Sequence, residues 1–382
     1  MKRIAVFIGT RPEAIKMAPV IAALRQSDAL APVVISTGQH REMIDQVIRL
    51  FGIEVDVELA AMEPAQTLAG LTSRLIERID VALGELAPDF TLVQGDTTTV
   101  LCAALASFYR RIPFGHVEAG LRTGNLAAPF PEEANRRLTT PLAELHFAPT
   151  ATARDALLRE GVRDDRVLVT GNTVIDALHM ELARQQRDDV RREIDAHFAE
   201  LIGPDWRQRT LVLVTGHRRE NFGPGFEQIC TALDQLASRM PAVRIVYPVH
   251  LNPRVKEVVH ARLASRDNIH LIPPQSYAQF VALAAACRLI LTDSGGVQEE
   301  APTLGKPVLV MRDTTERPEG VAAGAVMLVG THAERILQES ERLLTDDAAY
   351  DRMARVANPY GDGRAAERIV ERIRQYFDGP KA

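Results

Sequence analysis

The chain has 382 residues, of which 46% are hydrophobic and 25% are charged, and its formal net charge is -5. This length exceeds one typical domain of roughly 100 to 200 residues, so we expect two domains, and the composition excludes a disordered or fibrous chain. The negative charge gives no general attraction to nucleic acid or to an anionic membrane, so an anionic ligand must be held by local basic side chains.

The cysteines Cys102, Cys230 and Cys287 all lie in apolar stretches, and none belongs to a Cys-x-x-Cys pair. This usage is typical of buried free thiols in a reducing compartment. The longest apolar runs, such as residues 280–287, are far shorter than the ~20 residues that span a bilayer. We therefore expect a cytoplasmic protein with no membrane or nucleic-acid partner.

Short runs rich in Val and Ile alternate with longer helical patterns along the whole chain, which is typical of an α/β protein with parallel sheets. The first series of predicted strands lies at residues 4–8, 33–36, 91–94, 113–117, 145–148 and 167–170. The second series lies at residues 211–215, 244–249, 269–272, 289–292, 307–311 and 326–329. The pattern predicts two Rossmann-like parallel-sheet domains.

A highly charged helical stretch separates the two series and includes the run RQQRDDVRRE. After the last strand, helices are expected at residues 333–345 and 364–377, on either side of the turn NPYGDG. We predict an N-terminal domain at residues 1–175, a charged connection at 176–208 and a C-terminal domain at 209–360. A final helix at 361–382 is predicted to pack back on the first domain.

The turn after the first strand contains Thr10, Arg11, Glu13 and Lys16. Ligands of open parallel sheets bind beyond the carboxyl ends of the strands, so such turns are the first places to search. Thr10 and Glu13 can form a capping box, which is a purely structural interpretation. Arg11 and Lys16 lie near a helix N-terminus, which favours phosphate. Both interpretations can hold together.

Motifs that are absent also restrict the function. The first turn lacks the G-x-G-x-x-G pattern of dinucleotide-binding turns, the chain has no G-x-x-x-x-G-K-[ST] motif, and no cluster of residues has metal-ligand spacing. We therefore expect no nicotinamide cofactor, no ATP hydrolysis and no metal.

Two turns of the second half are rich in groups that can bind an anion. His217 and Arg218 follow the strand at 211–215 after Gly216, although a surface basic cluster is the alternative. Residues Asp293–Glu300 place Ser294, Gly295 and Gly296 at a strand-to-helix turn, where bare backbone amides can hold a diphosphate. A simple Ser-capped helix is the alternative there. Glu300 could accept hydrogen bonds from ribose hydroxyls.

Three carboxylates of the first half are candidates for acid-base chemistry. Asp96 and Glu118 each follow a predicted strand, so both should reach the same edge of the sheet. Asp96 can instead be the N-cap of a helix that begins at Thr97. Burial of Glu118 between apolar neighbours is unfavourable unless it serves a purpose. Glu132 and its neighbour Glu133 can alternatively form i,i+4 ion pairs on a solvated helix face.

Several long motifs occur in one order along the chain: GTRPEAIKMAP, GQHREM, QGDTTT, GHVEAGLRT, PFPEEANRR, GNTVIDAL, TGHRREN, YPVHLNP, TDSGGVQEEAP, MRDTTERPE and NPYGDG. Together they closely resemble the non-hydrolysing bacterial UDP-N-acetylglucosamine 2-epimerases, from residue 4 to about residue 368. No departure from the family pattern occurs within the catalytic blocks.

The resemblance implies a glycosyltransferase-B-like fold with the active site in the cleft between the two domains, and a homodimer. It implies reversible conversion of UDP-GlcNAc to UDP-ManNAc, which serves bacterial surface polysaccharides, without metal or nicotinamide. The implied catalytic residues are Asp96, Glu118, Glu132 and His217. The implied substrate contacts are Arg11, Lys16, Asp96, Glu118, His217, Gln275, Phe280, Ser294, Gly295, Gly296, Glu300 and Arg317.

The bacterial epimerases of this family can also hold a second UDP-GlcNAc as an activator. The matching motif positions are Gln39, Glu42, Glu132, Arg218 and His250. Such a ligand would favour a closed state and so couple two sites. A capped helix start at GQHREM is the alternative.

The sugar carbon that is inverted is not next to a carbonyl, so we expect breakage of the anomeric C–O bond and elimination to a 2-acetamidoglucal. Asp96 is the expected primary base, with Glu118 and Glu132 stabilising ring charge and returning the proton. Three other functions remain open: a glycosyltransferase of the same fold, a hydrolysing 2-epimerase and a nucleotide-sugar sensor.

Overall fold

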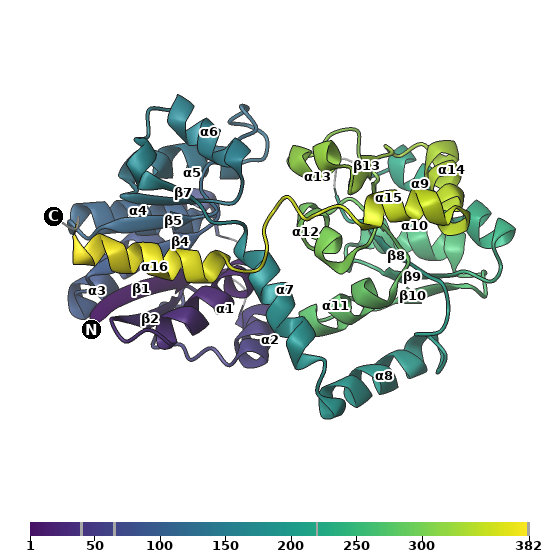
Figure 1. The fold of residues 1–382 in the computed structure, drawn as a ribbon, viewed down its shortest axis with the longest axis horizontal. Coiled ribbons are helices and arrows are strands. Elements are labelled where there is room, and N and C mark those ends of the chain that lie inside the picture. Colours follow the sequence, from purple (N-terminus) through teal and green to yellow (C-terminus); the bar gives the residue numbers. More distant parts are fainter. Residues whose placement is uncertain (39–40, 64–65, 219–220, 380–382) are drawn as a thin grey trace. The chain divides into compact units, whose positions relative to one another are not determined.

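The computed structural model describes residues 1–38, 41–63, 66–218 and 221–379, apart from the side chains of residues 41–43. The chain divides into two compact units (Figure 1). Unit 1 contains Met1–Ala177 and Tyr360–Ala382, and unit 2 contains Leu178–Pro359.

Within the described residues, unit 1 is built on a seven-stranded sheet with the order β3-β2-β1-β4-β5-β6-β7, and every neighbouring pair is parallel. Its strands are β1 (Lys2–Ile8), β2 (Leu30–Ser36), β3 (Val57–Glu58), β4 (Phe90–Gln94), β5 (Phe114–Val117), β6 (Leu145–Ala148) and β7 (Val167–Val169).

The helices of unit 1 cover this sheet and include the last helix of the chain. They are α1 (Arg11–Arg25), α2 (Arg41–Phe51), α3 (Leu68–Leu86), α4 (Thr98–Tyr109), α5 (Glu132–Thr139), α6 (Ala151–Arg159), the start of α7 (Thr173–Arg184) and α16 (Ala365–Asp378). Single 3-10 turns lie at Thr140–Leu142 and Asp164–Arg166. One core cluster joins Phe7 and Val93 of the sheet to Leu75 of α3 and Val100 of α4.

Helix α16, labelled in Figure 1, belongs to unit 1 although unit 2 precedes it in sequence. It packs against α1, and its residues Tyr376 and Phe377 make edge contacts with the ring of Phe90 in β4. The Ala366 amide donates to Asp176 at 2.8 Å. The last helix is therefore an integral part of the unit 1 core.

Within the described residues, unit 2 is built on a six-stranded parallel sheet with the order β10-β9-β8-β11-β12-β13. Its strands are β8 (Leu211–Thr215), β9 (Arg244–Pro248), β10 (Ile269–Ile272), β11 (Leu289–Thr292), β12 (Val308–Val310) and β13 (Val326–Leu328). Its helices are α8 (Asp188–Ile202), α9 (Pro224–Arg239), α10 (Pro253–Leu263), α11 (Tyr277–Ala286), α12 (Gly295–Glu300), α13 (Pro318–Ala323), α14 (Ala333–Thr345) and α15 (Asp347–Ala354), with a 3-10 turn at Ala301–Leu304.

The strand order reverses once in each sheet, between β1 and β4 in unit 1 and between β8 and β11 in unit 2. Ligands of open α/β sheets bind at such reversals, beyond the carboxyl ends of the two strands. The turns after these four strands carry the predicted groups Arg11, Asp96, His217 and Ser294. The topology therefore brings them to the positions where a ligand is expected.

The prediction of two parallel-sheet α/β domains is confirmed. Strand β3 and helix α15 were not predicted, since a strand of two residues carries no repeating pattern. The division of the chain differs from the predicted boundaries, because residues 188–202 are not a separate connection. Helix α8 buries Phe198 in one core cluster with Trp206 and Leu213 of unit 2, so it belongs to that unit.

All three cysteines are free and buried, as predicted. In the described part of the chain, every helix is too short or too polar to span a bilayer.

Candidate functional site

The turn after β1 starts α1 with the predicted capping box. Thr10 is the N-cap, its hydroxyl accepts from the Glu13 amide at 3.5 Å, and Glu13 Oε2 accepts from the Thr10 amide at 2.7 Å. Glu13 Oε2 also accepts from the Gly9 amide at 2.7 Å, and Glu13 Oε1 accepts from the Thr97 hydroxyl. Glu13 therefore ties the turn after β1 to the turn after β4.

Burial raises the pKa of Glu13 to about 7, against the opposing hydrogen bonds of Thr97, Gly9 and Thr10. Below pH 4.5 the side chain is protonated in both the folded and the unfolded chain. As the pH rises from 4.5 to about 7, the unfolded chain ionises first, so this group's contribution to the free energy of unfolding is lost over that window.

We therefore expect wild type to lose about 3 kcal/mol of stability relative to Glu13→Gln between these pH values. Glutamine has the same shape and can keep the amide contacts, but it does not titrate. The check is the difference in free energy of unfolding between the two proteins, measured by urea titration at several pH values. Parallel pH profiles would contradict the raised pKa.

Glu118 follows β5 and is the meeting point of several polar side chains in unit 1. Its carboxylate oxygens lie 2.7 Å from Lys16 Nζ, Asn172 Nδ2 donates to Oε1 at 3.3 Å, and Gln94 Nε2 donates to Oε2. Glu118 is buried, and its φ of 64° is uncommon for a residue other than glycine. Such a conformation persists only where the surrounding contacts enforce it. The fold thus holds this carboxylate beside a lysine.

Asp96 lies in the turn after β4, where neighbouring side chains hold the backbone. His116 Nε2 donates to the Gly95 carbonyl at 2.7 Å, and Asn135 Nδ2 donates to the Asp96 carbonyl at 2.9 Å. The Asp96 carboxylate lies 3.3 Å from Arg136 Nε. The alternative that Asp96 caps a helix is wrong, because α4 begins one residue later than expected and its N-cap is Thr97.

The pKa of Asp96 is raised above its ordinary value of 3.8. Burial is the main cause, the negative charges of Glu118 and Glu132 add to it, and Arg136 and Lys16 oppose it. The three predicted carboxylates are therefore close enough to influence one another within unit 1.

The two glutamates at the start of α5 have different surroundings. Glu133 is fully buried and accepts from the amides of Thr123 and Gly124 at 3.1 and 3.2 Å. Glu132 Oε2 is buried without a hydrogen-bond partner among the described residues. A buried carboxylate oxygen without a partner is unfavourable, so it is a natural point for a substrate group or a water to bind.

The predicted i,i+4 ion pairs of this helix are wrong. Arg136 is buried and lies 3.6 Å from Glu133 at i,i+3, while it also reaches Asp96. Arg137 instead lies 3.9 Å from Glu160. The sequence indicates that both arginines form ion pairs. It does not indicate that Glu133 is the more buried of the two glutamates, because that burial depends on the turn at Thr123 and Gly124, whose amides donate to Glu133.

At the strand reversal of unit 2, Asp293 organises the turn after β8. Its Oδ2 accepts from the amides of His217 and Arg218 at 2.9 and 2.8 Å and from Asn221 Nδ2 at 3.2 Å. Asp293 is fully buried. The sequence motif that contains Asp293 does not indicate this role, since the contacts reach back more than 70 residues in the chain.

The rings of His217 and His250 stack with their centroids 5.6 Å apart. The pKa of His217 is lowered from 6.5, chiefly by burial, with the charges of Arg218 and His250 adding to the shift and that of Asp293 opposing it. Two histidines and Arg218 thus lie together near the end of β8.

Ser294, Gly295 and Gly296 follow β11 at the same reversal. Ser294 is the N-cap of α12 but its side chain makes no capping hydrogen bond, so the alternative of a simple Ser-capped helix is wrong. A Cβ at Gly296 would meet no atom within 4 Å, and one at Gly295 would lie 3.9 Å from Arg218 Nη2. Protein packing therefore does not require glycine at these positions, which leaves close approach of a ligand as a reason for them.

The remaining predicted contacts of unit 2 have defined neighbours. Glu300 accepts from the Tyr277 hydroxyl at 2.7 Å, and Glu300 and Phe280 line the same small cavity. Gln275 is held by His197 at 2.8 Å. Arg317 Nε donates to the buried Glu299.

Of the positions predicted for a regulatory ligand, Gln39 lies outside the described residues, and the side chain of Glu42 is not described. His250 Nδ1 accepts from the Asn252 amide at 3.1 Å. Within the described ranges, no group of three or more His, Cys, Asp or Glu side chains is arranged to hold a metal ion.

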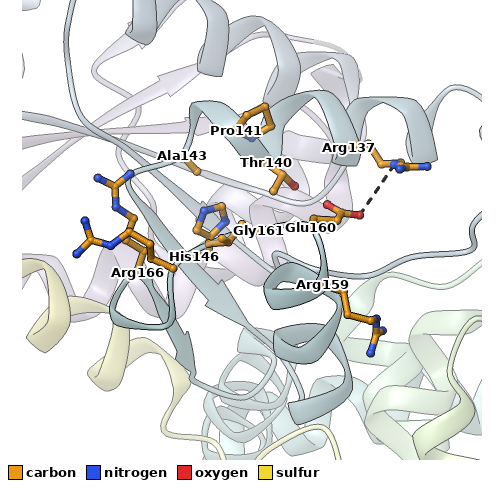
Figure 2. A pocket seen from close by; sticks show the side chains of 11 residues that line it. Arg137, Thr140, Pro141, Ala143, His146, Arg159, Glu160, Gly161 and Arg166 are labelled. Carbon is orange, nitrogen blue, oxygen red and sulfur yellow. Dashed lines mark ion pairs between the residues drawn. The ribbon is translucent and has the colours of Figure 1, made fainter.

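A separate pocket of unit 1 has a volume of about 620 Å³. It is lined by Arg137, Thr140, Pro141, Ala143, His146, Arg159, Glu160, Gly161, Val162, Arg163 and Arg166. In Figure 2 the guanidinium groups of Arg137 and Arg159 lie on the opposite side of the view from Arg166. The lining contains no predicted site residue, and these cations do not converge on one point.

A family model described as UDP-N-acetylglucosamine 2-epimerase matches residues 22–374. A UDP-N-acetylglucosamine 2-epimerase of Yersinia pestis is 56% identical over 377 residues, covering 98% of this chain and 99% of the relative. The Escherichia coli K12 enzyme of the same description is 55% identical, covering 98% of both chains.

Solved structures agree with these sequence relatives. The UDP-GlcNAc 2-epimerase of Neisseria meningitidis bound to UDP-GlcNAc matches with a TM-score of 0.90 at 48% identity, covering 98% of this chain and 99% of that one. The Methanocaldococcus jannaschii UDP-GlcNAc 2-epimerase in complex with UDP-GlcNAc and UDP matches with a TM-score of 0.82 at 33% identity, covering 97% and 99%.

Proposed function

The chain belongs to the UDP-N-acetylglucosamine 2-epimerase family, and from this premise we propose how its UDP-N-acetylglucosamine 2-epimerase activity operates. We propose that it interconverts UDP-GlcNAc and UDP-ManNAc by elimination and re-addition of UDP. UDP leaves with the electron pair of the anomeric C–O bond, and a base takes the proton from C2. The product of this half-reaction is 2-acetamidoglucal. UDP then adds back to C1 while a proton returns to the opposite face of C2.

Elimination is favoured because the C2 proton is not next to a carbonyl and is not acidic in the ground state. Loss of UDP builds positive charge on the ring, and that charge acidifies the neighbouring C–H bond. Catalysis therefore needs a base, an acid and groups that stabilise departing UDP.

The observation that carries this proposal is the set of carboxylates in unit 1 with contrasting surroundings. Asp96 has a pKa raised above its ordinary value, chiefly by burial, which suits a group that takes and gives a proton. Glu118 is paired with Lys16 at 2.7 Å, which suits a charged group that stabilises the ring. Glu132 has a buried oxygen without a partner among the described residues. We assign the primary base to Asp96.

The basic and amide-rich turns of unit 2 suit the UDP part of the substrate. We propose that His217, Arg317 and the amides of Ser294–Gly296 stabilise the charge that gathers on departing UDP. Glu300 is proposed to accept from the ribose hydroxyls. These assignments rest on the topology and on the polar groups after β8 and β11.

The first test is to incubate the purified protein with UDP-GlcNAc alone in heavy water and follow the products by NMR. We expect UDP-ManNAc that carries deuterium at C2, because the proton is removed and returned by side chains that exchange with solvent. UDP-ManNAc that keeps all its C2 hydrogen would exclude the elimination mechanism. Release of free ManNAc would indicate a hydrolysing enzyme, and no reaction would favour a transferase or a sensor.

Family membership alone supports four further proposals. They are a homodimer, a cytoplasmic location, supply of ManNAc units for bacterial surface polysaccharides, and activation by a second UDP-GlcNAc.

A further inference from the structure

Asp293 is the residue that the structure connects most directly to His217. One carboxylate oxygen, Oδ2, accepts from the His217 amide, the Arg218 amide and Asn221 Nδ2. These three bonds fix the backbone at the end of β8. The other oxygen, Oδ1, lies 3.4 Å from His217 Nδ1.

Oδ1 of Asp293 is buried and has no hydrogen bond among the described residues. A buried carboxylate oxygen in this state is unfavourable, and the His217 ring, 3.4 Å away, is a group that can donate to it. A small rotation of that ring, whose side chain is 41% exposed, would convert the contact into a hydrogen bond. In the neutral ring, this hydrogen bond requires that the proton is on Nδ1, because an ionised carboxylate can only accept hydrogen bonds.

From this geometry we propose that Asp293 is a positioning residue that sets the tautomer and direction of His217. With Nδ1 turned to Asp293, Nε2 is the nitrogen that faces away and is presented to a ligand. The inference rests on the proposed role of His217 toward departing UDP. A histidine is oriented by the partner of its second nitrogen in many catalytic sites.

The charged and titratable groups that face His217 are Asp293, Arg218 and His250. Of these only Asp293 favours the protonated ring, and the other two disfavour it. Asp293 therefore has two separable effects on His217, which are the position of its proton and its affinity for a second proton.

The variant Asp293→Asn separates these two effects on His217 from the role of Asp293 in fixing the backbone at the end of β8. The asparagine oxygen can keep the three bonds that Oδ2 accepts, while its NH₂ group faces His217 in place of Oδ1. His217 Nδ1 must then accept, so the proton of the neutral ring moves to Nε2. We expect kcat to fall roughly tenfold or more, the size of a coupling between contacting residues. We also expect the His217 pKa to fall, because the negative charge is gone.

The readouts are the His217 tautomer and pKa from nitrogen-15 NMR, together with kcat in a double-mutant cycle with His217→Ala. We expect the tautomer to change from Nδ1–H in wild type to Nε2–H in Asp293→Asn, and Asp293→Asn to have no further effect on kcat in the His217→Ala background. The matched control is Asp347→Asn, since Asp347 is an exposed aspartate of the same unit that pairs with Arg288. It should change neither readout.

Two outcomes would overturn the proposal. One is a neutral His217 with its proton on Nε2 in wild type, a measurement that remains decisive even if Asp293→Asn does not fold. The other is an equal loss of kcat from Asp293→Asn with and without His217, which would make the role of Asp293 purely structural. If His217→Ala alone keeps full activity, the proposed role of His217 toward UDP fails, and the NMR result then decides the positioning by itself.

Discussion

Asp96→Asn is expected to lower the rate of UDP-GlcNAc epimerisation by roughly 10²-fold or more, the typical effect of a positioned acid-base group. Asparagine keeps the size of the side chain but cannot take a proton from C2. Its oxygen can still face Arg136, which lies 3.3 Å from the carboxylate in wild type. The substrate affinity should therefore change much less than kcat. The measurement is steady-state kinetics in both directions, with UDP binding determined by calorimetry.

Glu118→Gln and Glu132→Gln are companion variants that test the other two proposed roles in the same assay. Asp80→Asn is the matched control, because Asp80 is a part-exposed aspartate of unit 1 that pairs with Arg110 away from these groups. It should keep the wild-type rate. Normal turnover in all three site variants would remove the carboxylates from the mechanism and leave them with structural roles.

Lys16→Met is expected to lower the free energy of unfolding by about 3 kcal/mol, because removal of one partner from a buried ion pair leaves the other charge poorly compensated. The side chains of Lys16 and Glu118 are only 12% and 5% exposed, and their charged atoms lie 2.7 Å apart. Methionine fills similar space without a charge. Glu118 would keep the bonds from Gln94 and Asn172, so the expected effect lies at the low end for such pairs.

The double variant Lys16→Met/Glu118→Gln should recover most of that stability, since it removes both charges together. Circular dichroism during urea unfolding measures the effect. Fluorescence of Trp206, the single tryptophan of the chain, follows unit 2 in the same experiment. If Lys16→Met unfolded at the wild-type urea concentration, the ion pair would contribute little, and its function would lie in substrate binding alone.

Patterns that repeat along the chain allowed much of the fold to be predicted. The apolar runs of β1, β4, β8 and β11 are continuous because both faces of a parallel sheet are covered, and such runs are visible in sequence. Their ends then indicated Arg11, Asp96 and His217 as neighbours of a ligand. The capping box of α1 was also predictable, because Thr10 and Glu13 are only three positions apart and so form a local pattern.

Contacts between distant parts of the chain could not be predicted in this way. The sequence predicts Glu13 as part of a capping box, but its hydrogen bond from Thr97 crosses 84 positions. Asp293 contacts the amide of His217 across 76 positions. The sequence leaves a solvated helix face open as an alternative for Glu133, because the turn that buries it leaves no repeating pattern. The roles of Glu13 and Asp293 depend on which strands are neighbours in the sheet, which no local motif records.

The return of the chain to unit 1 sets an order for folding during synthesis. Residues 178–359 of unit 2 are all made before α16, the helix whose Tyr376 and Phe377 pack on Phe90. At about 5 to 20 residues per second, the ribosome needs many seconds to make the intervening unit. The apolar surface around Phe90 therefore stays uncovered for that time. Unit 1, whose first part is translated before unit 2, is completed only after unit 2 has been made.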